Sequence, residues 1–415
     1  MISGGFEGQE GLERAQNIAA LLNSGALPVK LTEIYSTSVG AQFGEQALDE
    51  TVTAGLIGVA LVFIYMIAFY RLPGVVAAVT LSVYIYLTIF GFNMISGVLT
   101  LPGIAALILG VGMAVDANII MYERIKDELR IGRNLKQAYK KASAASLWTI
   151  IDANITTLVA GVVLFAFGTS SVKGFATMLL LSILMSFITA VFLTRFLLSM
   201  LIKSGFFNNR LGWFGVKEES RYSINEGKDI EDLTTPWDRF DFVGHSGKFF
   251  AFSLGTIMVG LLILSIFRLN LGIDFTSGTR ADIQTDGEAT VEQVEEELEA
   301  MDLSPDSITT SGDNMVVVRY AENLPQDSVT EMQSTFDDLY GSEPAISTVS
   351  PVIGQELAKN AVIALAIASI GIILYATIRF EWRMALPSVL ALIHDAFIMI
   401  AVFSIFRLEV DITFI

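Results

Sequence analysis

The chain has 415 residues, of which 53% are hydrophobic and 17% charged, and its mean hydropathy is +0.59. These values exclude an ordinary soluble domain and indicate a polytopic α-helical membrane protein. No cysteine and only two histidines are present, which excludes disulfides and leaves little for a metal site. Glycine-rich phosphate loops are absent, so we expect no ATP drive within this chain. We also predict no enzyme activity, no metal site and no cofactor.

The net charge of −17 is concentrated in one segment. Residues 281–345 hold seventeen Asp and Glu side chains against the single Arg319. A nucleic-acid partner would require a basic stripe that releases counterions from phosphates, and the sequence has none outside the membrane loops. The composition therefore predicts one compact acidic domain and no nucleic-acid binding.

In chain order, residues 1–50 carry no signal peptide, and residues 28–39 are predicted to be extended. The segment opens like the tail of a larger domain, so we assign it to the end of an extracytoplasmic domain and expect the true N-terminus to be missing. Five apolar runs follow, each long enough to span about 30 Å of hydrocarbon. They cover residues 52–70, 74–95, 101–121, 147–167 and 175–201 of the transmembrane part 51–203.

The orientation of these spans follows from basic side chains in the loop after the third span, which the positive-inside rule places in the cytoplasm. They are Arg124, Lys126, Arg130, Arg133, Lys136, Lys140 and Lys141. This loop also invites a lipid-binding interpretation, but acidic residues dilute it, and the orientation rule explains it better. Residues 204–247 form a second, turn-rich cytoplasmic loop that is predicted to link two halves of the protein.

A sixth span, within residues 248–268, returns the chain to the outside, where residues 269–350 form the acidic domain. Its pattern predicts strands at 279–285, 307–311, 315–320 and 345–349, and helices at 291–301 and 327–339. This βαββαβ order is the ferredoxin-like arrangement. Spans at 357–378 and 384–406 complete residues 351–415, and we expect further spans to follow.

The two outside segments and the helix pairs after them look like parallel repeats. With Gly44 laid on Gly354, Tyr65 falls on Tyr375. In both copies an outside segment leads through a glycine into a span that ends in a short charged turn. Such repeats, related by an axis along the membrane normal, enclose the functional path at their interface.

Asp116 is the central candidate, because it places an ionisable acid in an otherwise apolar span. An ionised carboxylate there costs about 2.5–3.5 kcal/mol, so such residues mark functional sites. Asp152 opens a second Asp-Ala-Asn tripeptide that mirrors the first across the cytoplasmic loop. If the two acids are neighbours, one of them is expected to hold a proton. Further candidates for a proton path or for helix packing are Asn118, Asn154, Thr156, Thr157 and Gly112.

A structural interpretation of both acids stays open. An aspartate within two turns of the membrane boundary is hydrated by local thinning of the bilayer, or it pairs with a basic residue such as Arg124, and then it only anchors its helix. His394 and Asp395 in the eighth span also have two interpretations, a proton relay or a hydrogen-bonded polar pair between helices.

Six stretches carry a resemblance to a known family. GVGMAVDANIIMYERIKDEL (110–129), TIIDANITTLVAGVVLFAFGTSSVKGFA (149–176) and SVGAQFGEQAL (38–48) are similar to the SecD half of the SecDF protein-export membrane components of bacteria. NLGIDFTSGT (270–279), WDRF (237–240) and HDAF (394–397) resemble the start of the SecF half. Ser277 departs from the family's GIDFxGG motif, and we interpret it as tolerable loop variation.

The resemblance implies an RND-superfamily protein of the bacterial cytoplasmic membrane that uses the proton-motive force, and no cofactor, to promote late preprotein translocation. It implies that Asp116 carries the proton, and it places the family's partner acid and arginine in spans beyond the last residue. The implied partners are the SecYEG channel, the emerging preprotein, YajC and membrane lipid. Two other classes stay open: an RND exporter of small or lipidic molecules, and a translocon scaffold that does not use the acid.

Overall fold

The computed structural model describes residues 35–208, 210–218, 221–223, 228–233, 239–285, 291–311, 315–411 and 414. Predictions for residues 1–34 and for the first half of WDRF lie outside this part of the chain. Within it, eight helices are long and apolar enough to cross a membrane. The predicted polytopic helical membrane protein is therefore confirmed.

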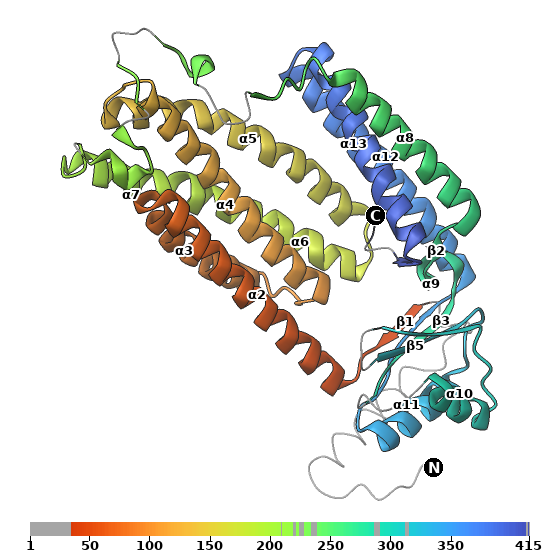
Figure 1. The fold of residues 1–415 in the computed structure, drawn as a ribbon. Coiled ribbons are helices and arrows are strands. Elements are labelled where there is room, and N and C mark those ends of the chain that lie inside the picture. Colours follow the sequence, from red (N-terminus) through yellow and green to blue (C-terminus); the bar gives the residue numbers. More distant parts are fainter. Residues whose placement is uncertain are drawn as a thin grey trace, which may run out of the picture.

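The first group of helices packs around a buried apolar core (Figure 1). Gly110 allows its helix to approach the helices of Tyr84 and Ser182 closely. A Cβ atom at this position would collide with the Tyr84 hydroxyl and lie 2.8 Å from Ser182. The group consists of α2 (Ala41–Tyr70), α3 (Leu72–Met94), α4 (Leu101–Arg130), α5 (Leu135–Phe167), α6 (Ser170–Ser186), a π-helical segment (Phe187–Leu193) and α7 (Thr194–Lys203).

The basic segment after the third span is mostly helical, so its prediction as a loop is wrong in extent. Helix α4 runs on to Arg130, and only residues 131–134 connect it to α5. Ion pairs one turn apart continue α4 beyond its apolar part: Lys126 with Glu123 at 2.8 Å, and Arg130 with Asp127 at 3.7 Å. The side chain of Asn134 then caps α5.

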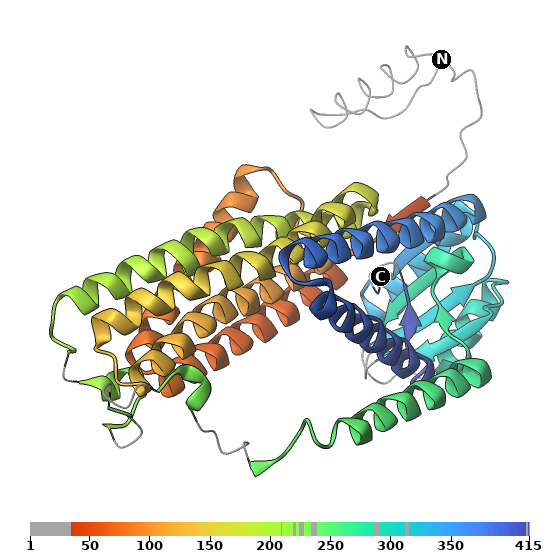
Figure 2. The same ribbon diagram turned by 90° about the horizontal axis from the view of Figure 1, so that it is seen from above.

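The second group consists of α8 (Ser246–Phe267), α12 (Pro351–Arg379) and α13 (Trp382–Ile405). The interval between the starts of α2 and α12 is the same as that between the starts of α3 and α13. Gly44 and Gly354 are each the fourth residue of their helix, so the predicted parallel repeats are confirmed. Seen from above, α12 lies along α5 and is the main helical contact between the groups (Figure 2).

The acidic segment folds as predicted. Its elements are β3 (Gly278–Gln284), α10 (Val291–Ala300), β4 (Ser307–Thr310), β5 (Met315–Tyr320), α11 (Gln326–Tyr340) and β6 (Ala345–Val349). The strand order β6-β3-β5-β4, antiparallel throughout, is that of a ferredoxin-like sheet. Apolar side chains of α10 and α11, including Leu298 and Phe336, pack on one face of the sheet.

A fifth strand, β1 (Tyr35–Ser38), was not predicted as part of this sheet. It pairs antiparallel with β6, with Tyr35 opposite Val349 and Ser38 opposite Ile346. Strand β1 directly precedes α2, and β6 directly precedes α12. One helix of each group, α2 and α12, therefore starts from adjacent strands of one sheet.

The end of α13 is also tied to the sheet domain. Strand β2 (Asn270–Leu271) pairs in parallel with β7 (Glu409–Val410), which follows α13. Arg280 of β3 donates to the carboxylates of Glu409 and Asp282, both at 2.7 Å. Burial opposes the charge of Arg280, but the two carboxylates outweigh it and raise the pKa of this guanidinium.

The connection between the short helix α9 (Ile273–Thr276) and β3 explains the family's paired glycines. Ser277 has φ +64° and ψ 174°, a region that glycine alone occupies easily. Gly278 has φ +115°, and a Cβ atom there would collide with the carbonyl oxygen of Tyr320. The interpretation of Ser277 as tolerable loop variation therefore needs correction, because serine adopts this conformation under strain.

These two positions should respond to substitution in opposite ways. Ser277→Gly should raise the free energy of unfolding of the sheet domain by about 1 kcal/mol, because it relieves the strain. Gly278→Ala should lower it by more than that amount, because it adds both strain and a collision. The temperature at which protease cleaves the sheet domain of the purified protein measures both effects. Equal midpoints for Gly278→Ala and the parent protein would refute this account.

Candidate functional site

Asp116 lies in a small pocket between α4 and α5. The pocket has a volume of about 170 Å³ and is lined by Met113, Asp116, Ala117, Ile120, Ile150, Ala153, Asn154 and Thr157. The Asp116 side chain is exposed, and among the described residues no hydrogen bond or ion pair reaches its carboxylate. The structure thus places an acid without a counter-ion on a membrane-spanning helix, where such groups mark functional sites.

Several predicted polar neighbours lie on the same two helices. Asn154 lines the pocket, and its amide donates to the Ile150 carbonyl at 2.7 Å. The hydroxyls of Thr156 and Thr157 both donate to the Ala153 carbonyl, at 2.8 and 3.2 Å. These three side chains therefore satisfy themselves within α5, as hydroxyl and amide groups in membrane helices commonly do.

Two residues of α4 differ in their surroundings. Gly112, one turn before Asp116, faces open space, since a Cβ atom there would meet nothing within 4 Å. Asn118 is 1% exposed, and its Oδ1 atom is buried without a hydrogen-bond partner in the described part of the chain. A buried unsatisfied oxygen is costly, so Asn118 carries an unpaired acceptor on the inner side of α4.

Asp152 has a different set of partners from Asp116. Its Oδ1 atom accepts a hydrogen bond from the Tyr375 hydroxyl at 2.7 Å and from Arg379 Nε at 2.8 Å. Both partners lie on α12, so this polar cluster joins the first helix group to the second. The α5 residues that line the Asp116 pocket, such as Ala153 and Asn154, face α4 instead. The structure therefore does not bring the two acids together in one site.

The sequence did not predict this cluster between the helix groups. The sequence predicted only a short charged turn at the end of this span, to which Arg379 belongs, and it singled out Tyr375 only as the repeat equivalent of Tyr65. The Trp148 ring of α5 lies 5.9 Å from the Arg379 guanidinium and adds a cation–π contact. The sequence did contain a signal for this cluster. An acid, Asp152, in one half and a basic residue, Arg379, in the other both lie near the cytoplasmic ends of their spans.

His394 and Asp395 form a local pair on α13. His394 Nδ1 lies 3.1 Å from Asp395 Oδ1, and the Asp395 side chain is 79% exposed. The other ring nitrogen of His394 is buried without a partner in the described part of the chain. The pair lies on a helix that contacts neither α4 nor α5 extensively, so it belongs to a different surface from the Asp116 pocket.

The residues described also contain no group of three or more His, Asp or Glu side chains that could hold a metal ion. Repeated helix pairs, a ferredoxin-like sheet that joins them and an acid without a counter-ion in one span define the class: a polytopic membrane protein of the RND-like type. Residues 23–204 and 328–415 match the family described as "Protein export membrane protein SecD/SecF, C-terminal", and residues 262–289 match the "SecD/SecF GG Motif". The chain belongs to the SecD/SecF family, and it is a multi-pass membrane protein.

Relatives match the chain along its whole length. It is 54% identical to the protein translocase subunit SecDF of Bacillus subtilis, over 100% of this chain and 56% of that protein. Identity to the SecDF subunit of Brucella abortus is 29%, over 98% and 52% of the two chains. The chain thus spans about half the length of these relatives.

Solved structures of relatives show the same fold. The crystal structure of SecDF from Thermus, described as a translocon-associated membrane protein, matches with a TM-score of 0.80 at 30% identity, over 99% of this chain and 54% of that one. SecDF in a super-membrane-facing form matches with a TM-score of 0.64. The predicted fold and the predicted membrane location are thereby confirmed.

Proposed function

We propose that this chain forms part of a proton-motive-force-driven accessory component of the Sec protein translocase, which promotes late translocation of preproteins across the bacterial cytoplasmic membrane. Family membership supports the connection to protein export. The single observation that carries the proton-driven part is Asp116, an exposed carboxylate in an otherwise apolar span that no counter-ion reaches among the described residues. The proposed partners are the SecYEG channel and the emerging preprotein.

The membrane potential supplies enough free energy for a proton at Asp116 to shift the protein between two conformations. One elementary charge that crosses 100 mV of membrane potential is worth about 2.3 kcal/mol, which biases a two-state equilibrium by tens-fold. A proton that enters at Asp116 neutralises the carboxylate and removes its need for water. The packing of α4 against its neighbours then changes, because a neutral side chain tolerates an apolar contact that a charged one does not.

The arrangement of the sheet supports a route from this packing change to the preprotein. Strands β1 and β6 are hydrogen-bonded neighbours, and each leads directly into a helix of a different group. A shift of one helix group against the other must therefore either deform the sheet domain or move it as a whole. In the proposed mechanism the sheet domain moves with the helices and acts on the preprotein outside the membrane.

The proposal is tested with the protein reconstituted into vesicles together with the SecYEG channel. Translocation of a preprotein is started with ATP and the ATP is then removed, so that only a proton gradient remains. We expect the gradient to complete translocation only in vesicles that contain this protein, and an uncoupler to abolish the effect. Equal completion with and without the protein would refute the proposal, and efflux of a small apolar compound without the channel would favour an exporter.

A further inference from the structure

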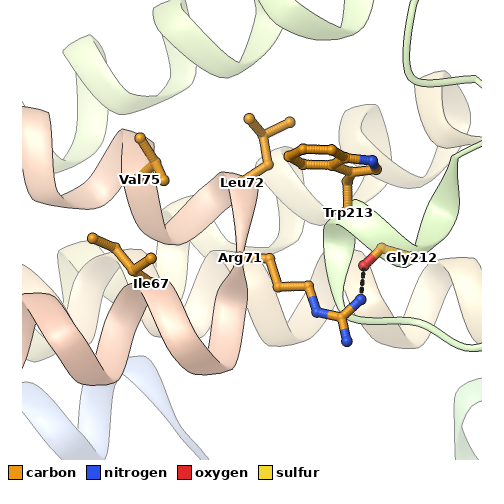
Figure 3. A pocket seen from close by; sticks show the side chains of 6 residues that line it. All are labelled: Ile67, Arg71, Leu72, Val75, Gly212 and Trp213. Carbon is orange, nitrogen blue, oxygen red and sulfur yellow. Dashed lines mark hydrogen bonds between the residues drawn. The ribbon is translucent and has the colours of Figure 1, made fainter.

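A groove lies at the turn between α2 and α3, beside the short 3-10 helix at Leu211–Phe214 (Figure 3). Its volume is about 510 Å³. Lys126 of α4 lies over the Phe69 ring at 4.6 Å, so the groove lies at the same end of the bundle as the basic residues that follow the third span. The residues that line it are Ile67, Arg71, Leu72, Val75, Gly212 and Trp213.

The groove is charged at one end and apolar at the other. Arg71 stands between two membrane spans, at the boundary between hydrocarbon and water. Ile67 and Val75 each lie one helical turn away, about 6 Å deeper in the membrane, and they are 43% and 45% exposed. This order, a cation at the boundary and aliphatic side chains below it, matches the order of head group and acyl chain in a phospholipid.

Arg71 is fixed in place, and yet no carboxylate of the described residues pairs with it. Its Nη1 atom donates to the Gly212 carbonyl at 2.6 Å, as Figure 3 shows. Its backbone N–H also caps α2 on the Ile67 carbonyl at 2.9 Å. Within the described residues no carboxylate pairs with the guanidinium. Its remaining N–H groups are therefore free to bind phosphate oxygens, a geometry for which the guanidinium is well suited.

Trp213 completes the charged end of the groove. Its side chain is 51% exposed, although the neighbouring Leu211 and Phe214 are buried and anchor the 3-10 helix to the bundle. In Figure 3 the indole lies beside the Leu72 side chain, and the Arg71 side chain runs below it toward the Gly212 carbonyl. Tryptophan is enriched at the membrane interface, because its ring is apolar and its N–H group forms hydrogen bonds at the level of the head groups.

We propose that this groove binds an anionic phospholipid of the surrounding bilayer, with its phosphate at Arg71 and Trp213 and one acyl chain along Ile67, Leu72 and Val75. The charge favours an anionic over a zwitterionic lipid, because a zwitterionic head group would bring its own cation to an arginine that no described carboxylate neutralises. The lipid would clamp the 3-10 helix onto the α2–α3 turn. This inference does not depend on the proposed function.

The test uses quenching of tryptophan fluorescence in vesicles by brominated lipid. The chain has four tryptophans, so Trp148, Trp237 and Trp382 are first replaced by phenylalanine. Brominated phosphatidylglycerol and brominated phosphatidylcholine are then compared at the same mole fraction. We expect brominated phosphatidylglycerol to quench Trp213 more strongly than brominated phosphatidylcholine does. The difference should correspond to an enrichment of phosphatidylglycerol at the groove of about five-fold over the bulk bilayer, because one interfacial basic residue contributes about this factor.

Three variants separate the charge of Arg71 from its structural role. Arg71→Gln should remove the preference for phosphatidylglycerol, whereas Arg71→Lys should retain most of it. Arg210→Gln should leave it unchanged, because Arg210 stacks on the Phe206 ring at 4.2 Å outside the groove. A full preference in Arg71→Gln, or no preference in the parent protein, would overturn the proposal. Absence of quenching by either lipid would also overturn it, because a protein partner would then cover the groove.

Discussion

The Asp116→Asn variant should lose all of the translocation that a proton gradient drives, although it should still be inserted and folded. Asparagine has nearly the same shape as aspartate but cannot exchange a proton. In the described structure no hydrogen bond or ion pair reaches the Asp116 carboxylate, so the substitution breaks no contact there. The rate at which a half-translocated preprotein is completed in reconstituted vesicles should fall to the level of vesicles without the protein.

Asp127→Asn is the matched control for this experiment. Asp127 lies on the same helix, eleven positions after Asp116, and its carboxylate pairs with Arg130 at 3.7 Å. This acid belongs to the part of α4 that extends beyond the apolar span, so its neutralisation should leave gradient-driven completion unchanged. If Asp116→Asn completed translocation as fast as Asp127→Asn, the protein would act as a scaffold of the translocon and not as a proton-driven component.

The second large effect is expected at the contact between the helix groups. Arg379→Gln and Asp152→Asn should each loosen α12 from α5, because each removes the ion pair at 2.8 Å between the two groups. The double variant should be no looser than Arg379→Gln alone, since that substitution already removes the ion pair together with the Trp148 contact. Tyr375→Phe should have a smaller effect, because it removes one neutral hydrogen-bond donor and leaves the ion pair intact.

Cysteine crosslinking measures this contact directly, because the chain has no cysteine of its own. A Cβ atom at Gly371 of α12 would lie 2.8 Å from the Val159 side chain of α5, so a cysteine pair at these positions should form a disulfide. We expect the disulfide to form several-fold more slowly in Arg379→Gln than in the parent. Arg383→Gln is the control, because Arg383 contacts the Trp382 ring at 5.6 Å and is not the arginine that pairs with Asp152. Equal rates in all variants would show that the ion pair does not hold the groups together.

Most of the fold could be predicted because its signals are local. Long apolar runs mark the spans, and alternating apolar residues mark the strands of the sheet domain. The full length of α4 and α5 could not be predicted in the same way, because the apolar run ends at the membrane boundary. Beyond it, ion pairs such as that of Lys126 with Glu123 stabilise the continuing helix. Strand β1 was missed as part of the sheet because its partner, β6, lies about 310 residues later in the chain.

The candidate site could be predicted only in part. An acid in an apolar run is visible in the sequence, so Asp116 was singled out, and its role as proton carrier stays a prediction. The direction in which Asp152 points is not visible, because it depends on how α5 is rotated between α4 and α12. The two acids resemble each other in sequence, yet one faces a pocket and the other binds Tyr375 and Arg379.

The central claim is that protons pass through Asp116 while a preprotein moves. It is tested most directly by the pH inside vesicles that contain the protein, the SecYEG channel and a preprotein in transit, followed with a pH-sensitive dye after a proton gradient is imposed. We predict translocation-dependent proton entry for the parent protein and for Asp127→Asn, and none for Asp116→Asn. Proton entry at the parent rate in Asp116→Asn would contradict the claim.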